Sequence, residues 1–230
     1  MKLMNIEEEI PEIFYIFIEQ GRGIFSKINY HNYLLNKKLI SAGFNSIIAD
    51  PSKIKNFING DICYAPFIPI EQTLSVPSSH QLAVVNGYTV EYALEKYRND
   101  NFKRYPSRFS CLYAFGDMDS CNLASKKYKW DINNVKKFKL CNFEKDCTNE
   151  SDILNQAIKV CKCNMEIITY MWNTNIQFFP TNDVEKVCKN YWTGGGAIAA
   201  ETQDIETGNK ITTNSDILYE YLIEGILEEV

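Results

Sequence analysis

Hydrophobic and polar positions follow strand-like spacing in some parts of the chain and helix-like spacing in others. Continuous or partly alternating apolar runs predict strands over residues 12–18, 108–115 and 134–142. Residues 218–230 predict a final strand or a pair of strands. Because strands and helices are mixed without a repeating strand–helix unit, we expect an α+β fold with a largely antiparallel sheet.

Helices are predicted where apolar residues recur at helical spacing and capping residues precede them. Asp117 follows a predicted strand and has the chemistry of an N-cap residue. Residues 165–172 fit either a helix or a strand, and residues 61–82 contain three prolines and are predicted to be mainly loop. The predicted helices span residues 29–40, 87–99, 117–128, 151–160 and 183–191.

Composition places the chain among folded globular proteins. It has 230 residues, of which 45% are hydrophobic and 23% charged, so a single domain over residues 1–230 can bury a sizeable core. Charges or amides interrupt every apolar run before the roughly 18 residues that a membrane span needs. Three glutamates near the start occupy the place of a signal peptide's apolar stretch. We therefore expect a cytoplasmic protein that has no membrane partner.

The charge balance argues against a general coat for nucleic acid, because the net charge is -5. One region differs from this average and carries lysines on both sides of Trp130. Two interpretations stay open for it: a solvated helix end and strand edge, or a surface for nucleic acid or another acidic partner. The lysines are Lys126, Lys127, Lys129, Lys136, Lys137 and Lys139.

The cysteines do not have the spacing of a zinc site. None of the eight forms a C-x-x-C pair. Cys161 and Cys163 are two positions apart, and on a helix this spacing would point them to different faces. We expect reduced thiols that pack as small hydrophobic residues, and no metal site.

Several large enzyme classes lack their sequence motifs here. The chain has no phosphate-binding G-x-x-x-x-G-K-[ST] loop, no G-x-S-x-G and no H-E-x-x-H. The segment with the most specific character is YPSRFSCLYAF, residues 105–115. Arg108 offers a planar fork for a phosphate or carboxylate, and Ser107 and Ser110 are short donors beside it. In the alternative interpretation, Arg108 pairs with a structural carboxylate and the serines cap the strand.

The longer segment SRFSCLYAFGDMDSCNLASKKY resembles the central part of ADP-ribosyltransferase-like domains. The tail, YWTGGG followed by EYLIEGILEEV, is similar to the final part of small bacterial members of that superfamily. This resemblance implies a split antiparallel sheet with peripheral helices. It also implies a toxin-like transferase that moves ADP-ribose from NAD to a protein or nucleic-acid acceptor.

The resemblance also implies a set of site residues. Where the usual triads have a histidine or arginine, the first strand has Phe14-Tyr15-Ile16, so a noncatalytic module of the same fold stays open as an alternative. An NAD glycohydrolase is a further alternative. In an alternative interpretation that does not use the resemblance, Glu220 is an exposed strand residue and Trp192 is a core anchor at a helix end. The resemblance assigns catalytic roles to Glu220 and Tyr15, and NAD binding to Arg22, Arg108, Ser110, Tyr113 and Trp192.

Overall fold

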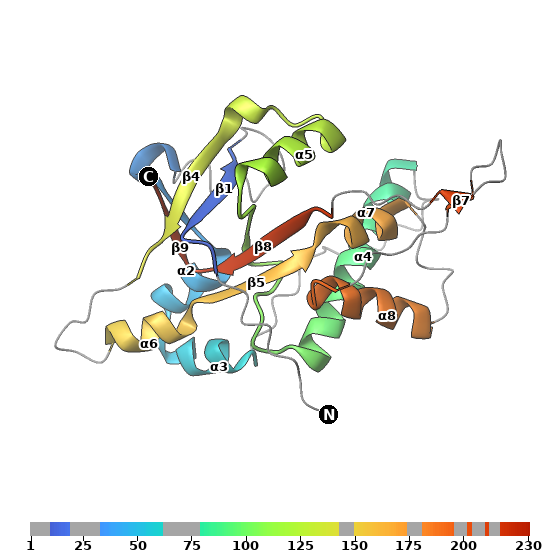
Figure 1. Ribbon diagram of the computed structural model, residues 1–230. Helices are drawn as coiled ribbons and strands as arrows, with labels where there is room; N and C mark the ends of the chain where they lie inside the picture. The colour runs from blue at the N-terminus through green and yellow to red at the C-terminus, as the bar shows by residue number, and fades with distance from the viewer. Residues whose placement is uncertain are drawn as a thin grey trace.

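Two antiparallel sheets form the centre of the protein (Figure 1). The computed structural model describes residues 10–18, 33–61, 79–142, 150–173, 181–195, 202–203, 210–211 and 217–230. Within them the fold is α+β, as the sequence predicts, and every strand pair is antiparallel.

The larger sheet has four strands in the order β1-β4-β9-β2, and the second has three in the order β3-β8-β5. A separate pair is formed by β6 and β7. The four-stranded sheet comprises β1 (Ile13–Phe17), β2 (Lys38–Ile40), β4 (Val135–Leu140) and β9 (Ile226–Glu229). The three-stranded sheet comprises β3 (Leu112–Ala114), β5 (Lys159–Asn164) and β8 (Tyr219–Glu224), and the pair comprises β6 (Thr202–Gln203) and β7 (Lys210–Ile211).

The two central sheets are joined by backbone contacts at two places. Strand β8 passes into β9 through Gly225, whose carbonyl accepts from the Ser41 N–H at 3.0 Å. Tyr15 and Phe115 exchange two hydrogen bonds of 2.8 Å and so connect β1 to the end of β3. Each sheet therefore fixes the position of the other.

The helices form groups around the sheets (Figure 1). Helices α4, α7 and α8 lie together beside the three-stranded sheet, whereas α2, α3 and α6 lie together at the opposite end and α5 lies beside β4. The helices are α2 (Ala42–Ala49), α3 (Ile54–Asn59), α4 (Ser79–Asn101), α5 (Met118–Tyr128), α6 (Glu150–Ala157), α7 (Met165–Asn173) and α8 (Thr181–Trp192), with 3-10 turns η1 (Pro51–Lys53) and η2 (Ile132–Asn134).

Apolar packing holds the α4–α7–α8 group against the three-stranded sheet. Leu94 of α4, Met171 of α7 and Leu222 of β8 are each fully buried in one cluster. Trp192, at the end of α8, belongs to the same cluster, and its indole N–H donates to the Leu94 carbonyl at 2.9 Å. Burying side chains of this size stabilises a fold by about 1.5–3 kcal/mol each, so the helices are fixed firmly over β8.

The strands predicted at 12–18 and 134–142 and the strand pair at 218–230 are confirmed. So are the helices at 87–99, 117–128 and 183–191. The predictions for residues 29–40, 61–82, 108–115 and 151–160 are wrong in part, and the structure decides residues 165–172, which fit either a helix or a strand.

The helix predicted over residues 29–40 is wrong at its C-terminal end. Residues 33–36 are helical, but Lys37 adopts a left-handed backbone (φ 56°) and residues 38–40 form β2. Strand β2 pairs with β9 from Lys38↔Glu228 to Ile40↔Ile226. Pairing with β9, which lies far along the chain, therefore makes residues 38–40 a strand in place of the predicted helix.

The helix predicted over residues 151–160 ends early, at Ala157, and β5 begins at Lys159. The alternation in KVCKCN fits a strand, and Val160 lies opposite Ile223 of β8. Cys161 and Cys163 consequently share one face of the strand, and their sulfur atoms lie 3.5 Å apart.

The strand predicted over residues 108–115 is shorter in the structure, where β3 spans only Leu112–Ala114. The chain before it forms a turn, in which the amides of Ser110 and Cys111 both donate to the Ser107 carbonyl.

Helix α4 begins at Ser79, inside the segment 61–82 that is predicted to be loop. Residues 62–78 of that segment lie outside the described residues. Residues 165–172 are helical, and the Asn164 side-chain oxygen accepts the Glu166 N–H at 3.1 Å.

Asp117 is the N-cap of α5, and its carboxylate accepts the Ser120 N–H at 2.6 Å. We predict that Asp117→Ala lowers the free energy of unfolding by about 0.5–2 kcal/mol, because a helix N–H loses its partner. Urea unfolding followed by circular dichroism measures the change. Asp119→Ala, which removes a first-turn charge but no cap, is the control and should cost less. Equal losses in both variants would contradict the capping role.

Candidate functional site

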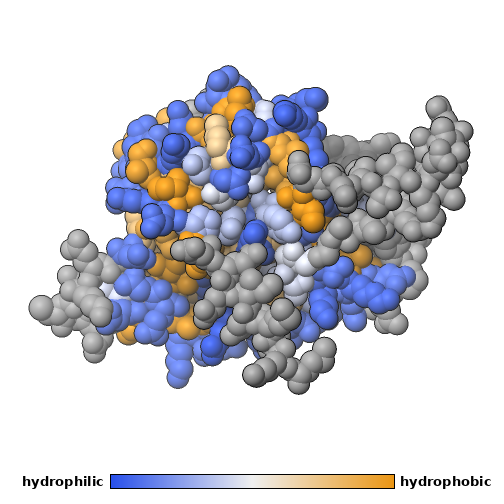
Figure 2. Space-filling view, in the orientation of Figure 1, coloured by the Kyte–Doolittle hydropathy of each residue, from blue (hydrophilic) through white to orange (hydrophobic). Residues whose placement is uncertain are grey.

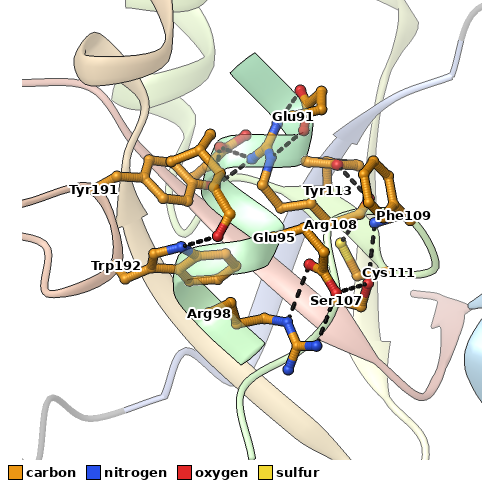
Figure 3. Close-up of polar contacts among 12 residues, drawn as sticks. Glu91, Glu95, Arg98, Ser107, Arg108, Phe109, Cys111, Tyr113, Tyr191 and Trp192 are labelled. Atoms are coloured by element: carbon orange, nitrogen blue, oxygen red, sulfur yellow. Dashed lines mark hydrogen bonds and ion pairs between the residues drawn. The ribbon is translucent and has the colours of Figure 1, made fainter. Parts of the chain in front are cut away.

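Arg108 lies at the centre of a buried network of charged and aromatic side chains (Figure 3). It follows α4 in the chain and precedes β3. Its Nε and Nη2 donate to the two carboxylate oxygens of Glu91 on α4, at 2.6 and 2.8 Å. Its Nη1 donates to Oε1 of Glu220 on β8 at 2.8 Å. The guanidinium therefore connects a helix to the central strand of the three-stranded sheet.

Glu220 is held on one side only. Its Oε1 accepts from Arg108 and, at 2.7 Å, from the hydroxyl of Tyr191 on α8. Among the described residues its other oxygen, Oε2, has no hydrogen-bond partner. The side chain is 7% exposed. A buried carboxylate oxygen without a partner is costly in a folded protein, and such atoms call for a ligand, a water or a catalytic role.

Aromatic rings enclose the guanidinium. The rings of Tyr113 and Tyr191 each lie 5.1 Å from Arg108 Cζ, measured to the ring centroid. The Tyr113 hydroxyl donates to the Arg108 carbonyl at 2.6 Å, yet the residue is 38% exposed. Tyr191 is fully buried. Tyr113 is thus the aromatic residue through which the network reaches the surface.

The network keeps its groups in defined protonation states. Burial by itself would lower the pKa of the Arg108 guanidinium, but its electrostatic interactions with Glu91, Tyr113, Tyr191 and Glu220 together outweigh burial and raise that pKa well above its ordinary value. Burial raises the pKa of the Tyr191 hydroxyl well above its ordinary value. Arg108 stays cationic and Tyr191 stays protonated, so both remain donors to Glu220.

A second buried ion pair anchors the segment that carries Arg108. Arg98 on α4 donates through Nη2 and Nε to Glu95, at 2.8 and 3.0 Å, and through Nη1 to the carbonyls of Lys103 and Tyr105. The Ser107 hydroxyl donates to Glu95 at 2.8 Å. Glu91 and Glu95 lie one turn apart on α4, so both hold the chain between α4 and β3 from the same helix face.

Glu224 forms a separate node, four residues beyond Glu220 and on the same face of β8. Its carboxylate accepts from the hydroxyl of Ser41 at 2.7 Å and from that of Ser110. Ser41 in turn caps α2 and accepts the Gly225 N–H at 3.0 Å. A Cβ on Gly43 would lie 2.6 Å from Glu224 Oε2. This node holds the junction of the two sheets, and both of its carboxylate oxygens are satisfied.

The structure brings three of the predicted site residues together: Arg108, Glu220 and Tyr113. Glu220 is buried, not exposed, and Arg108 pairs with carboxylates, as its alternative interpretation states. Trp192 is a core anchor at the end of α8, which is its alternative interpretation, and it packs edge-on to Tyr191.

The other predicted site residues lie elsewhere. The Ser110 hydroxyl is used by Glu224. Tyr15 packs in a different cluster, with Phe115 and Trp130. No contact between Tyr15 and either Arg108 or Glu220 occurs in the part of the chain that is described. Arg22 lies outside the described residues.

Sequence reasoning missed Glu91, Glu95 and Tyr191. The two glutamates are four positions apart on a predicted helix, which is a detectable signal for carboxylates on a shared face. Tyr191 is adjacent to Trp192, the aromatic residue that the resemblance implies, and only the side-chain orientations on α8 distinguish the two.

In the residues that the structure covers, the cysteines are free thiols and do not form part of a metal site. There, no group of three or more His, Cys, Asp or Glu side chains is arranged to hold a metal ion. The free thiols there are Cys111, Cys121, Cys141, Cys161, Cys163 and Cys188. No helix among the described residues is long and apolar enough to cross a membrane.

Residues 18–228 match the family described as "Protein of unknown function (DUF2441)", and the chain belongs to that family. The matched region contains Glu91, Arg108, Tyr191 and Glu220. No curated protein shows significant similarity to the chain.

Glu224 makes stability depend on pH. Burial, opposed by the Ser110 and Ser41 hydrogen bonds, raises its pKa from 4.5 to about 7. The folded state therefore holds a proton that the unfolded state releases, and stability falls as pH rises from about 4.5 to about 7, by on the order of 3 kcal/mol.

Urea unfolding at about pH 5 and about pH 7.5 tests this dependence. Glu224→Gln has no such proton to lose, so the decline should largely disappear in that variant. Glu228→Gln, on the exposed part of β9, should keep it. An unchanged pH dependence in Glu224→Gln would contradict the assignment.

Proposed function

We propose that the protein is an NAD-dependent ADP-ribosyltransferase. The observation that supports this most strongly is the Glu220 carboxylate: Oε1 is fixed by Arg108 and Tyr191, and Oε2 is buried without a partner among the described residues. The two antiparallel sheets joined at β8–β9 are compatible with the split sheet of ADP-ribosyltransferase-like domains.

In this proposal NAD supplies an ADP-ribosyl group, and its bond to nicotinamide breaks through an oxocarbenium-like state. Glu220 Oε2 accepts a hydrogen bond from a ribose hydroxyl and places negative charge beside the positive charge that develops. Arg108 and Tyr191 keep the carboxylate in one orientation, so no reorganisation is needed during the reaction. The accessible ring of Tyr113 offers a surface for the nicotinamide.

Arg108 takes a different role from the one that the resemblance implies. Its Nε, Nη1 and Nη2 already donate to Glu91, Glu220 and Tyr191, so it is a positioning residue for Glu220 and not a clamp for the pyrophosphate. Arg22 stays the predicted pyrophosphate ligand, and the catalytic role of Tyr15 stays a prediction. The proposal includes a cytoplasmic location, where thiols are kept reduced.

One observation favours a second candidate, a noncatalytic module. The same ion pairs that orient Glu220 also connect α4, α8 and β8, and this gives the carboxylate a structural reason to be buried. The two candidates differ in what Glu220 contributes to the rate of NAD cleavage.

We predict that Glu220→Gln leaves the Kd for NAD within about threefold, because it removes charge that matters mainly in the transition state. Nicotinamide release and transfer of labelled ADP-ribose to macromolecules in a lysate should slow about 100- to 1,000-fold. Calorimetry measures binding, and Glu228→Gln is the surface control.

Absence of NAD binding by the unmodified protein would overturn the cofactor assignment and favour the noncatalytic module. Normal turnover by Glu220→Gln would overturn the role of Glu220. Nicotinamide release without a labelled macromolecule would identify an NAD glycohydrolase instead.

We also predict that Arg108→Lys, which keeps the charge but loses the planar fork, lowers kcat about 10- to 100-fold while the Kd for NAD is nearly unchanged. The reason is that Glu220 loses its fixed orientation. If the Kd rises and kcat is preserved, Arg108 contacts NAD directly. Melting curves establish that the variant is folded before kinetics are compared.

A further inference from the structure

Residues 126–139 carry six lysines and one aspartate, in a chain whose net charge is -5. All six lysines are exposed. On β4, Lys137 and Lys139 share the face of Tyr15, whereas Lys136 lies on the opposite face with Phe138. We call the other five lysines the basic surface. They lie on the last turn of α5, on its left-handed C-cap Lys129, and on β4. Figure 2 shows hydrophilic residues mixed with hydrophobic ones at the upper end of the molecule, where α5 and β4 lie in Figure 1.

Internal ion pairs leave most of this charge uncompensated. Lys127 pairs with Glu166, and Lys139 lies opposite Glu228 in the sheet. No carboxylate within ion-pair distance of the other three lysines of the basic surface is found in the described ranges. A local cluster of unpaired positive charge on an acidic protein fits a strongly anionic partner.

Aromatic rings are interleaved with these lysines. Tyr128 and Trp130 are half-buried, with ring centroids 5.1 Å apart, and Tyr15 is half-buried on β1 with Lys137 Nζ 5.8 Å from its centroid. Alternating cationic side chains and partly accessible rings are the combination that binds single-stranded nucleic acid, whose phosphates pair with lysine and whose bases stack on rings. An acidic protein segment, in contrast, has no bases that could stack on these rings.

One end of the basic surface contacts α7, the helix that follows the strand paired with β8. The Tyr128 hydroxyl is 2.7 Å from Thr169 Oγ1 on α7, the helix that follows β5. Asn164, the last residue of β5, lies opposite Tyr219, the neighbour of Glu220. Burial raises the pKa of Tyr128, and the charges of Glu166 and Glu220 raise it further. A strand bound along the basic surface would therefore extend toward the candidate site.

We propose that the basic surface binds single-stranded nucleic acid and presents it as the acceptor; the acceptor role rests on the proposed transferase activity. In the transfer, a nucleophilic nitrogen or oxygen of the nucleic acid forms a bond to C1′ of the ADP-ribosyl group. The bond from C1′ to nicotinamide breaks, nicotinamide leaves with the electron pair, and the proton of the nucleophile passes to solvent.

Binding is tested without NAD, so its failure is distinguishable from failure of the transferase proposal. Fluorescence anisotropy is measured for a labelled single-stranded DNA of mixed sequence, the same sequence as RNA, and the DNA duplex, over a series of salt concentrations. The variant carries Lys126→Gln, Lys129→Gln and Lys137→Gln. The control carries Lys53→Gln, Lys55→Gln and Lys186→Gln, three exposed lysines outside the basic surface.

We expect the unmodified protein to bind a single strand more tightly than the duplex, with DNA or RNA preferred according to the natural acceptor. The variant should bind at least about tenfold more weakly, and the slope of log K against log salt should be lower by about 2, because three phosphate contacts are lost. The control should bind normally, and nicotinamide release without acceptor should be unchanged in both.

Three results would overturn the proposal: no binding to either single strand, tighter binding to the duplex, or stronger competition by polyglutamate than by unlabelled single strand. If a single strand binds but acquires no label from labelled NAD in the presence of active protein, the surface is a binding site and the acceptor role fails.

Discussion

The Arg108 guanidinium connects two helices to the central strand of the three-stranded sheet. It pairs with Glu91 on α4, with Glu220 on β8 and with Tyr191 on α8, and it follows directly on the segment that Glu95 and Arg98 anchor. Arg108, Glu220, Tyr191, Glu95 and Arg98 are buried and Glu91 is partly buried, and a buried charge that loses its partner costs about 3–5 kcal/mol. The orientation of Glu220 and the polar connection of α4 and α8 to β8 therefore depend on one residue, in addition to the apolar packing of these helices.

The two carboxylates on the same face of β8 show how one strand carries two different environments. Glu224 is satisfied by two serine hydroxyls and its pKa is raised to about 7 by burial, so it belongs to the junction of the sheets. Glu220 faces a cation and a tyrosine, and among the described residues one of its oxygens has no partner. The partners, more than the residue type, separate the structural from the candidate functional role.

The sequence predicts those parts of the fold whose signals are local. The β1 run, the Asp117 cap and the strand pair at the end are read from neighbouring residues. The end of α6 and strand β2 depend on pairing with β8 and β9, which no local window contains. At the candidate site, the planar fork of Arg108 suits a carboxylate or phosphate, whereas Glu220 is predicted only from the resemblance to ADP-ribosyltransferase-like domains. Glu91 and Tyr191 were missed because only the packing of α4 and α8 brings them to Arg108.

The position of β8 and β9 has a consequence for how the protein is made. Both strands come after all the other described strands in the chain, yet each is an interior strand of its sheet, β8 between β3 and β5 and β9 between β4 and β2. Neither sheet can be completed on the ribosome until residues 219–229 have been synthesised. Until then, β1 with β4 is the only pair of the two central sheets, among the strands described, that can form. The apolar faces of the other strands stay uncovered during that time, a state that favours aggregation of incomplete chains.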